Sequence, residues 1–431
     1  MPRTVRFYTL GCKVNQYDSE AMLERFLEKG YVAARQGEAA DVYVVNTCMV
    51  TGTGENKSMQ AARRFKRQNP NGELIIAGCL AQSKGETLRD TGARLVIGTQ
   101  FRGEIAELFE QAIAENSQII AVDSLSRAAF EPLSIHGHQG HTRALMKIQE
   151  GCDNRCTFCI VPTVRGGIRS RTLADIRVEA GRLAQAGFKE VVLTGVHLTS
   201  YGRDLEDRPS LPDAIQAVAQ TDGIERIRLG SLEPVIVTDA FIRAIAKIPK
   251  LCPQFHLALQ SGSDAVLRRM KRRYNTMQFL TAAKRLGQAF ADVALTTDII
   301  VGFPGETEEE FQETVDFCRK IGFMKIHVFP YSQRAGTPAA VMDGQVPKHV
   351  KDERVRELIA VGEALSADYR SRMLQTVQPV LIEEKQHGGL YAGYTPQYVP
   401  VVCEKGTIGD IIPLRLTSLT KEGMRGEPAN A

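Results

Sequence analysis

Hydrophobic positions in the first 125 residues form short apolar runs separated by amphipathic segments. The runs predict strands at 5–10, 41–45, 73–77, 94–97 and 119–122, and the segments between them predict helices at 19–29, 55–68 and 101–115. Strands that alternate with helices build a parallel sheet with helices on both faces. Residues 1–125 are therefore expected to form a doubly wound α/β domain.

A polar segment at 126–141, which carries His136, His138 and His141, is expected to link this domain to the next. Beyond it the alternation restarts, with strands predicted at 144–149, 191–194, 226–229, 256–259, 293–301 and 326–329 and helices such as 172–186 and 307–321 between them. Six strand–helix units over residues 142–371 predict a (βα)6 partial TIM-like barrel, open on one side. In such barrels the chemistry lies at the C-terminal ends of the strands.

The last segment, residues 372–431, changes to short strands split by Gly and Pro turns, predicted at 377–384, 391–394, 398–402 and 411–416. This pattern is typical of a small five-stranded β-barrel. Tyr391, Tyr394 and Tyr398 could stack on RNA bases, or the module could be a structural cap. The tail from Glu422 is expected to be loose.

Composition narrows the class of protein. The chain has 431 residues, of which 43% are hydrophobic and 24% charged, as in ordinary globular proteins. It has no apolar run near the roughly 20 residues that a membrane helix needs, and no signal-peptide pattern at its start, so a cytoplasmic protein with no membrane association is expected. Nine cysteines in such a chain favour free thiols and metal ligands over a disulfide framework.

Three cysteines stand close together at Cys152, Cys156 and Cys159. Thiolates at this Cys-x3-Cys-x2-Cys spacing can hold three irons of a cubane iron–sulfur cluster and leave the fourth iron open, as a catalytic metal centre requires. Phe158, just before the last cysteine, could shield such a cluster. A structural zinc site is the alternative, but zinc needs a fourth Cys or His, and the next histidine is His197.

Three further cysteines, Cys12, Cys48 and Cys79, each follow a predicted strand of the first domain. Because the C-terminal ends of parallel strands meet at the edge of the sheet where ligands bind, these thiols are expected to converge. The sequence thus predicts a second cluster with an open iron, against the alternative of three unrelated free thiols.

Small and polar residues follow the predicted barrel strands. The candidates for cofactor binding are Phe158, Gly195, Ser231, Glu233, Gln260 and Ser261. Gly195 would let a ligand approach the backbone closely, and Glu233 could hydrogen-bond ribose hydroxyls. Gln260 and Ser261 could contact a sugar or a carboxylate, and Asp298 is the candidate catalytic group. Each of these residues could instead belong to an ordinary turn, and it is their common position at one rim that favours binding.

Positive charge is concentrated in two runs, although the net charge is only +4. The candidates for substrate binding are Lys57, Arg63, Arg64 and Arg67 in the first run, and Arg268 and Arg272 in the second. Such runs are often solvated helix faces, but two of them beside a predicted active site favour a polyanionic substrate.

The cysteine motif at Cys152–Cys159 resembles the signature of the radical S-adenosylmethionine (SAM) superfamily, and the whole chain resembles the radical SAM methylthiotransferases. The motifs that carry this resemblance are Leu10-Gly-Cys-Lys-Val-Asn-Gln16, Val45-Asn-Thr-Cys48, Ala77-Gly-Cys-Leu-Ala81, Leu259-Gln-Ser-Gly-Ser263, Thr297-Asp-Ile-Ile-Val-Gly-Phe-Pro-Gly-Glu306 and Tyr331-Ser. The resemblance implies two [4Fe–4S] clusters, SAM as both radical source and methyl donor, and a TRAM-like C-terminal barrel. It also implies that Cys12, Cys48 and Cys79 hold the auxiliary cluster.

The run Gly11-Cys-Lys-Val-Asn-Gln16 is most similar to the branch of this family that acts at C2 of N6-threonylcarbamoyladenosine, at position 37 of tRNA. The alternative within the family is isopentenyladenosine in tRNA. An alternative of a different class is a non-catalytic iron–sulfur protein that binds RNA. The resemblance implies tRNA as partner and a monomeric enzyme, and it leaves the sulfur donor and the electron donor unidentified.

Overall fold

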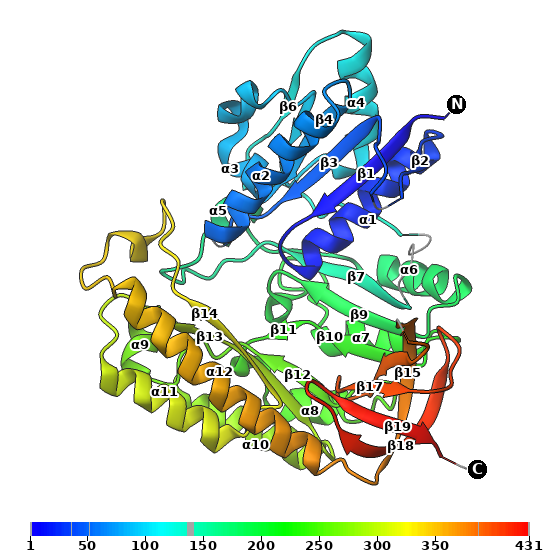
Figure 1. Ribbon diagram of the computed structural model, residues 1–431. Helices are drawn as coiled ribbons and strands as arrows, with labels where there is room; N and C mark the ends of the chain where they lie inside the picture. Colours follow the sequence, from blue (N-terminus) through cyan, green and yellow to red (C-terminus); the bar gives the residue numbers. More distant parts are fainter. Residues whose placement is uncertain (1, 36, 51, 136–141, 387, 430–431) are drawn as a thin grey trace.

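The computed structural model describes residues 2–35, 37–50, 52–135, 142–386 and 388–429, and its first part is a six-stranded parallel sheet in the order β2-β1-β3-β4-β5-β6 (Figure 1). The strands are β1 (Thr4–Thr9), β2 (Val32–Ala33), β3 (Val42–Thr47), β4 (Glu73–Gly78), β5 (Leu95–Ile97) and β6 (Ile119–Ala121). The helices are α1 (Lys13–Glu28), α2 (Gly52–Gln68), α3 (Cys79–Lys84) and α4 (Ile105–Ala114), with the 3-10 turns η1 (Gly85–Thr91), η2 (Arg102–Glu104) and η3 (Leu125–Arg127).

Both faces of this sheet are covered, as the alternation of strands and helices predicted. On β3, Val42 and Val44 point to a core shared with α1 and α4. Tyr43 and Val45 point to the opposite core, which contains Phe65 of α2. Since successive side chains of a strand point to opposite faces, an unbroken apolar strand needs helices on both sides.

Helix α1 begins at Lys13, six residues before the predicted start at residue 19. Its first turns carry buried polar residues, which concealed the helical period in the sequence. Asn15 shows why they are buried: its side-chain amide donates to the carbonyl oxygens of Leu10 at 2.7 Å and Thr47 at 2.9 Å. The helix therefore starts immediately after Cys12 and is fastened to the ends of β1 and β3.

The middle of the chain is a partial barrel of six parallel strands. These strands are β7 (Arg143–Glu150), β9 (Glu190–Gly195), β10 (Arg226–Leu229), β12 (Gln254–Leu257), β13 (Ala294–Val301) and β14 (Lys325–Pro330), with the short β8 (Arg169–Ser170) antiparallel to β7 and β11 (Ser231–Leu232) continuing β10. The helices are α5 (Val161–Arg165), α6 (Leu173–Gln185), α7 (Leu211–Ala219), α8 (Asp239–Ile245), α9 (Asp264–Arg269), α10 (Thr276–Ala289), α11 (Glu308–Ile321) and α12 (Lys348–Ser371), with the 3-10 turns η4 (Leu198–Ser200), η5 (Pro234–Ile236) and η6 (Pro338–Val341). The hydrogen-bonded sheet divides between β10 and β12, into the orders β10-β9-β7-β8 and β11-β12-β13-β14. The predicted partial barrel is confirmed.

Alternate residues of the barrel strands face outward and inward. Outward-facing residues, such as Met146 of β7 and Phe255 of β12, pack with the helices in the largest hydrophobic core. The inward-facing set is mostly polar and includes Lys147, Gln149, Glu190, Thr194, Arg226, Arg228, Gln254, His256, Thr296, Asp298 and His327. Helix α1 lies next to β7 (Figure 1). Tyr17 and Ala21 of this helix pack on Leu145 of β7 and Val192 of β9, so it covers part of the lumen.

The last part of the chain is a closed five-stranded barrel in the order β15-β16-β17-β19-β18. Its strands are β15 (Val377–Lys385), β16 (Tyr391–Tyr394), β17 (Pro400–Cys403), β18 (Ile411–Leu419) and β19 (Met424–Pro428). The expectation of a loose tail from Glu422 was wrong, because Met424–Pro428 closes the barrel between β17 and β18. Five residues with Gly and Pro among them gave too short a pattern to predict a strand.

Tyr394 and Tyr398 of the small barrel lie against the partial barrel. The rings of Tyr394 and Tyr398 stack at 4.7 Å between centroids. The guanidinium of Arg143 lies 5.0 Å from the first ring centroid and 4.9 Å from the second, and that of Arg228 lies 4.6 Å from the second. These two rings are therefore used within the protein, which favours the structural cap over RNA stacking at both positions.

His136, His138 and His141 lie outside the described residues. No helix formed by the described residues is long and apolar enough to cross a membrane.

Candidate active site

Cys12, Cys48 and Cys79 follow three neighbouring strands of the first sheet. Cys12 is the residue before α1, Cys48 comes directly after β3, and Cys79 opens α3 directly after β4. Gly11 has a φ of +108°, and a Cβ on it would lie 3.1 Å from the Cys48 sulfur, so only glycine lets the first loop approach the second so closely. The three loops meet at the switch point of the sheet, where β1 and β3 are adjacent while their connections run to opposite sides.

An arginine from the barrel domain reaches this triad. The Nε of Arg165, at the end of α5, donates a hydrogen bond to the Cys79 sulfur at 3.3 Å. Burial raises the pKa of the Cys79 thiol to about 11, and the Arg165 charge acts in the opposite direction. A buried thiol of this kind ionises readily only when a metal supplies further positive charge.

Cys152, Cys156 and Cys159 lie in the loop that follows β7, at the C-terminal end of the barrel strands. The Arg272 Nη1 donates to the Cys156 sulfur at 3.1 Å. Phe158 meets Phe303 edge to face, with ring centroids 6.5 Å apart, and so packs beside the loop. Burial raises the pKa of Cys152 to about 11 and that of Cys159 to about 12.

The two triads have matching sets of donors to sulfur. In the first, the backbone N–H of Val50 donates to Cys48 at 3.5 Å and Arg165 donates to Cys79. In the second, the backbone N–H of Asn154 donates to Cys152 at 3.4 Å and Arg272 donates to Cys156. Donors around ligand sulfurs stabilise and tune iron–sulfur clusters, so both donor sets fit this cofactor.

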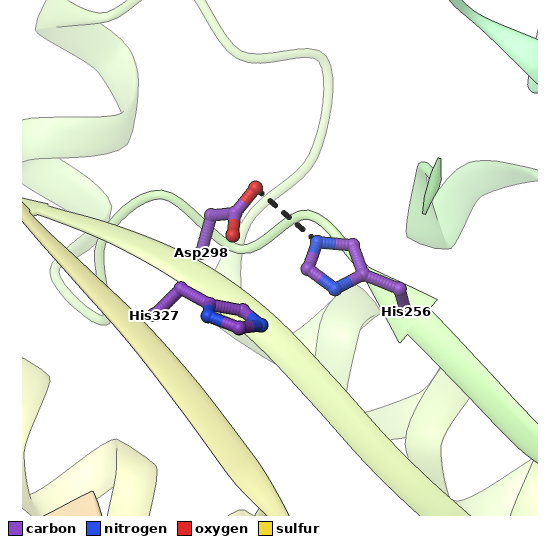
Figure 2. Close-up of side chains that lie close together, drawn as sticks. All are labelled: His256, Asp298 and His327. Carbon is purple, nitrogen blue, oxygen red and sulfur yellow. Dashed lines mark ion pairs between the residues drawn. The ribbon is translucent and has the colours of Figure 1, made fainter. Parts of the chain in front are cut away.

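The spacing of the sulfurs also bears on which metal fits. Among the described residues, His256, Asp298 and His327 form the group whose ligand atoms all lie within 4.8 Å of one another (Figure 2). In neither cysteine triad do the three sulfurs all lie within that distance. Tetrahedral zinc, at about 2.3 Å from each sulfur, needs sulfurs only about 3.8 Å apart. The wider triads suit a cubane, in which each cysteine binds a different iron.

A compact polar group lies beside the second triad. Glu233 pairs with Arg272 at 2.7 Å and with the His197 Nε2 at 3.2 Å, and it accepts a hydrogen bond from the Asn154 side chain at 3.0 Å. Burial acts to raise the pKa of Glu233, but the hydrogen bond from His197 and the Arg272 charge hold it below its ordinary value. Glu233 is therefore an anion here, and Arg272 is committed to it and to Cys156 rather than exposed to a phosphate.

The other predicted rim residues differ in what they can contact. A Cβ on Gly195 would lie 2.9 Å from the Gln149 Cβ, so this glycine serves close packing of β9 on β7. Ser231 is exposed, whereas Ser261 is fully buried and lies 3.2 Å from the Thr314 hydroxyl.

Gln260 and Asp298 are linked by their backbones. Gln260 has a φ of +72°, and its backbone N–H donates to the Asp298 carbonyl at 2.9 Å. The Asp298 side chain faces the lumen and pairs with the His256 Nε2 at 3.3 Å.

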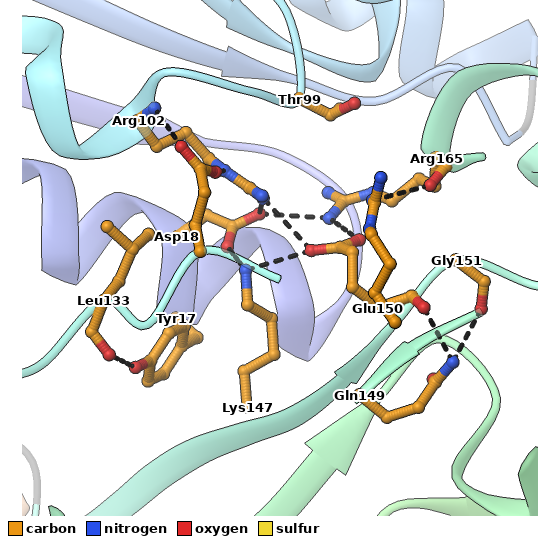
Figure 3. Close-up of polar contacts among 12 residues, drawn as sticks. Tyr17, Asp18, Thr99, Arg102, Leu133, Lys147, Gln149, Glu150, Gly151 and Arg165 are labelled. Carbon is orange, nitrogen blue, oxygen red and sulfur yellow. Dashed lines mark hydrogen bonds and ion pairs between the residues drawn. The ribbon is translucent and has the colours of Figure 1, made fainter. Parts of the chain in front are cut away.

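A buried ion network joins the sheet domain to the barrel (Figure 3). Asp18 of α1 pairs with Arg102 at 2.6 Å, with Lys147 at 2.5 Å and with Arg165 at 3.1 Å. Glu150 pairs with the same three cations, at 3.2, 3.0 and 2.7 Å. Opposite charges hold the pKa of both carboxyl groups low although burial opposes this, so the network is fully charged. Removing one member of such a buried network leaves an uncompensated charge and costs about 3–5 kcal/mol.

The sequence did not identify Asp18, Arg165 or Arg102 as parts of the site. Asp18 and Arg165 are 147 positions apart, and Arg102 and Glu150 are 48 apart, so no local spacing connects them. One signal was present: Lys147 is a charged residue inside the strand predicted at 144–149, Glu150 follows that strand directly, and such groups are rarely buried without partners.

The predicted basic residues are mostly at the surface. Lys57, Arg63, Arg64 and Arg67 are all exposed along α2, and Arg268 is exposed at the end of α9. The side chain of Arg272 is only 7% exposed.

Comparison with known proteins follows the division of the chain. Residues 146–318 match the profile of the radical SAM superfamily, and residues 4–98 match that of the uncharacterized protein family UPF0004. The first match covers the partial barrel from β7 into α11, and the second covers β1 to β5 with Cys12, Cys48 and Cys79.

Several curated proteins are similar over nearly the whole chain. The threonylcarbamoyladenosine tRNA methylthiotransferase MtaB of Bacillus subtilis is 42% identical over 422 residues, which cover 96% of this chain and 93% of that protein. The protein of the same name from Thermotoga maritima is 36% identical, with 98% and 96% covered. The tRNA-2-methylthio-N(6)-dimethylallyladenosine synthase of Acidothermus cellulolyticus is 40% identical, with 89% and 78% covered.

A solved structure shares the fold. The radical SAM methyltransferase TsrM of Kitasatospora setae, solved with cobalamin and a [4Fe–4S] cluster, superposes with a TM-score of 0.58 at 13% identity, covering 79% of this chain and 74% of that one. At this identity the likeness shows the fold alone.

Proposed function

This chain belongs to the radical SAM methylthiotransferase family, and from that premise we propose that it converts N6-threonylcarbamoyladenosine at position 37 of tRNA to its 2-methylthio derivative. The observation that carries the proposal is the full-length similarity to enzymes of that name together with both cysteine triads in one chain. A tRNA substrate makes the cytoplasm the expected compartment, and the enzyme is expected to act as a monomer.

Two [4Fe–4S] clusters would be held by the two triads, one by Cys152, Cys156 and Cys159 and the other by Cys12, Cys48 and Cys79. With SAM bound, these groups supply radical chemistry, sulfur and a methyl group. The proposed division of the chain assigns the auxiliary cluster to residues 1–125, SAM to residues 142–371 and a supporting role to residues 372–431.

The protein residues position and shield these groups. Arg165 and Arg272 donate hydrogen bonds to cysteine sulfur, and each is held by a buried carboxylate, Glu150 at 2.7 Å and Glu233 at 2.7 Å. Rigid donors of this kind stabilise negative charge on a cluster without reorganising. Phe158 packs against Phe303 beside the second triad, where it limits the access of water.

The proposal can be tested by mass spectrometry of tRNA nucleosides from cells with and without this gene. We expect the 2-methylthio derivative of N6-threonylcarbamoyladenosine only when the gene is present. A thiomethyl group on dimethylallyladenosine instead would show the other substrate. Purified protein that releases no 5′-deoxyadenosine from SAM under reducing conditions would point to a binding protein rather than an enzyme.

A further inference from the structure

Arg165 contacts two kinds of partner in the buried network between the domains (Figure 3). Its Nη1 donates to Glu150 at 2.7 Å and to Asp18 at 3.1 Å, and its Nη2 donates to the side-chain oxygen of Asn15. Its Nε donates to the Cys79 sulfur at 3.3 Å. One guanidinium therefore joins a cysteine of the first triad (Cys12, Cys48 and Cys79) to two buried carboxylates.

The backbone on either side of this guanidinium is fixed as well. Val164, the preceding residue, packs in an apolar cluster that includes Cys79. The Thr99 hydroxyl donates to the Val164 carbonyl at 2.9 Å, and the Arg169 Nη2 donates to the Arg165 carbonyl at 2.8 Å. A donor held in this way stabilises charge on its acceptor without first having to reorganise.

The segment that supplies Arg165 also carries the second triad, Cys152, Cys156 and Cys159. Helix α5, which ends at Arg165, begins two residues after Cys159. A single stretch of chain thus provides the cysteines of one site and a hydrogen-bond donor to the sulfur of the other.

Arg102 occupies an equivalent place in the network but lacks the contact with sulfur. It pairs with Asp18 at 2.6 Å and with Glu150 at 3.2 Å, and its side chain is 4% exposed, compared with 3% for Arg165. In the part of the chain that the structure describes, the hydrogen bond to Cys79 is made by Arg165 and not by Arg102. If the network served only to hold the two domains together, the two arginines would be equivalent.

We propose that Arg165 is a positioning residue that raises the reduction potential of the cluster at the first triad, through its hydrogen bond to Cys79. This inference rests on the proposed function, which assigns a four-iron cluster to that triad. Reduction by one electron adds one negative charge to the cluster and its thiolates. Hydrogen bonds to the sulfurs and nearby positive charge set the potential of such clusters, and both stabilise the more negative, reduced form.

The test measures this potential in a full-length chain that holds one cluster. The parent is the triple variant Cys152→Ala, Cys156→Ala, Cys159→Ala, reconstituted anaerobically and titrated with dithionite as the electron donor. Electron paramagnetic resonance gives the reduced fraction, and iron analysis verifies that the cluster is loaded. Arg165→Met in this parent should raise the ratio of oxidised to reduced cluster at the parent's midpoint by at least about tenfold. For a one-electron couple that is a fall of about 59 mV.

Arg102→Met in the same parent is the matched control. It removes one positive charge from the same two carboxylates but leaves the donor to Cys79 in place, so the ratio should change by less than about threefold. Arg165→Lys retains the charge that the carboxylates need but has no Nε–H group. It should raise the ratio by at least about threefold, and it decides the question alone if Arg165→Met does not load iron.

The proposal is overturned if Arg165→Met or Arg165→Lys, once loaded, has the potential of the parent. It is also overturned if Arg165→Met and Arg102→Met lower the potential equally, because the network then acts as a whole. A parent that holds no iron would remove the cluster from the first triad, and this inference with it. The proposed function is tested separately by tRNA analysis: a chain that modifies no tRNA but shows these shifts contradicts the function and supports the role of Arg165.

Discussion

At the scale of the residue, burial and ion pairing shift the pKa of the Glu306 carboxyl group in opposite directions. It accepts hydrogen bonds from the Gly302 backbone N–H and from Arg354, the latter at 2.9 Å. Burial outweighs these contacts and raises the pKa of Glu306 to about 7. The loop after β13 is therefore held by a carboxyl group that is costly to ionise.

This raised pKa predicts a specific dependence of stability on pH. Between the unfolded pKa of about 4.5 and the folded pKa of about 7, the folded state binds more protons than the unfolded state. The contribution of Glu306 to the free energy of unfolding is therefore complete below pH 4.5 and is lost as the pH rises through 7. Glu306→Gln cannot ionise, so its melting temperature should fall less than that of wild type between pH 5.5 and 8. Over this pH range wild type should lose at most about 2–3 kcal/mol more of its free energy of unfolding than Glu306→Gln does.

The matched control is Glu308→Gln, since Glu308 also pairs with Arg354, at 3.2 Å, but its side chain is 61% exposed. Its melting curve should follow wild type across this pH range. Parallel curves for wild type and Glu306→Gln would contradict the assignment.

At the scale of the element, α2 combines a buried face with a basic one. Ala61, Ala62 and Phe65 pack into the sheet core. Arg64 lies across the rings of Tyr8 and Phe65, at 5.3 and 4.9 Å from their centroids, which holds its charge near the helix surface. The exposed basic side chains leave this helix with a surface suited to a polyanion.

Reversing three charges on α2 should weaken the binding of tRNA. Each Lys or Arg that contacts a phosphate releases condensed counterions when tRNA binds. The combined variant Arg63→Glu, Arg64→Glu, Arg67→Glu should therefore bind tRNA more weakly. The slope of its log binding constant against log salt concentration should be smaller by roughly one unit per lost contact. The measurement is equilibrium binding of tRNA at several salt concentrations.

A triple reversal at Lys284, Arg319 and Lys320 makes the same change in net charge on exposed residues of α10 and α11. It should have a smaller effect on both quantities. If the two triple variants behave alike, α2 is a solvated helix face and the RNA binds elsewhere.

At the scale of the whole molecule, one interface connects both cysteine triads. Arg165 contacts Cys79 and Glu150, and Glu150 is two residues before Cys152. Arg334, in the loop before η6, pairs with Glu55 of α2 at 2.8 Å. This ion pair is a second contact between the barrel and the sheet domain. The two triads are thereby held in a common assembly rather than on independently moving domains.

The two triads should nevertheless load iron separately. Reconstituted wild type should contain about eight irons, from two four-iron clusters. The triple variant Cys12→Ala, Cys48→Ala, Cys79→Ala should retain about half and still release 5′-deoxyadenosine, but form no thiomethyl nucleoside. Replacing Cys152, Cys156 and Cys159 by Ala should also leave about half of the iron and abolish both products.

Cys318→Ala is the control, since Cys318 is a buried free thiol on α11 that belongs to neither triad. It should retain all of the iron. A wild type with a single cluster, or a triple variant that loses every iron, would contradict the two-site assignment.

The sequence alone determined the fold class, and it was sufficient to predict the cysteine ligands that the iron measurements above would test. Alternation of apolar runs with amphipathic segments is a local signal, and so is the spacing of Cys152, Cys156 and Cys159. The convergence of Cys12, Cys48 and Cys79 also followed from the sequence, because parallel strands bring their C-terminal ends to one edge. Local signals failed where an element was short, as in β19, or opened with buried polar residues, as in α1.

Only the tertiary structure decided what surrounds those ligands. Arg165 and Cys79 are 86 positions apart, and Arg272 and Cys156 are 116 apart, so nothing in the spacing of the chain predicts either contact. Arg272 had the pattern of a surface phosphate ligand, and the fold placed it inward on Glu233 instead. Charged side chains carry no period that distinguishes a solvated position from a buried one. A buried charge is stable only beside a counter-charge, and the counter-charge comes from another element that packs against it. Which residues pair therefore depends on the tertiary packing and not on their spacing in the sequence.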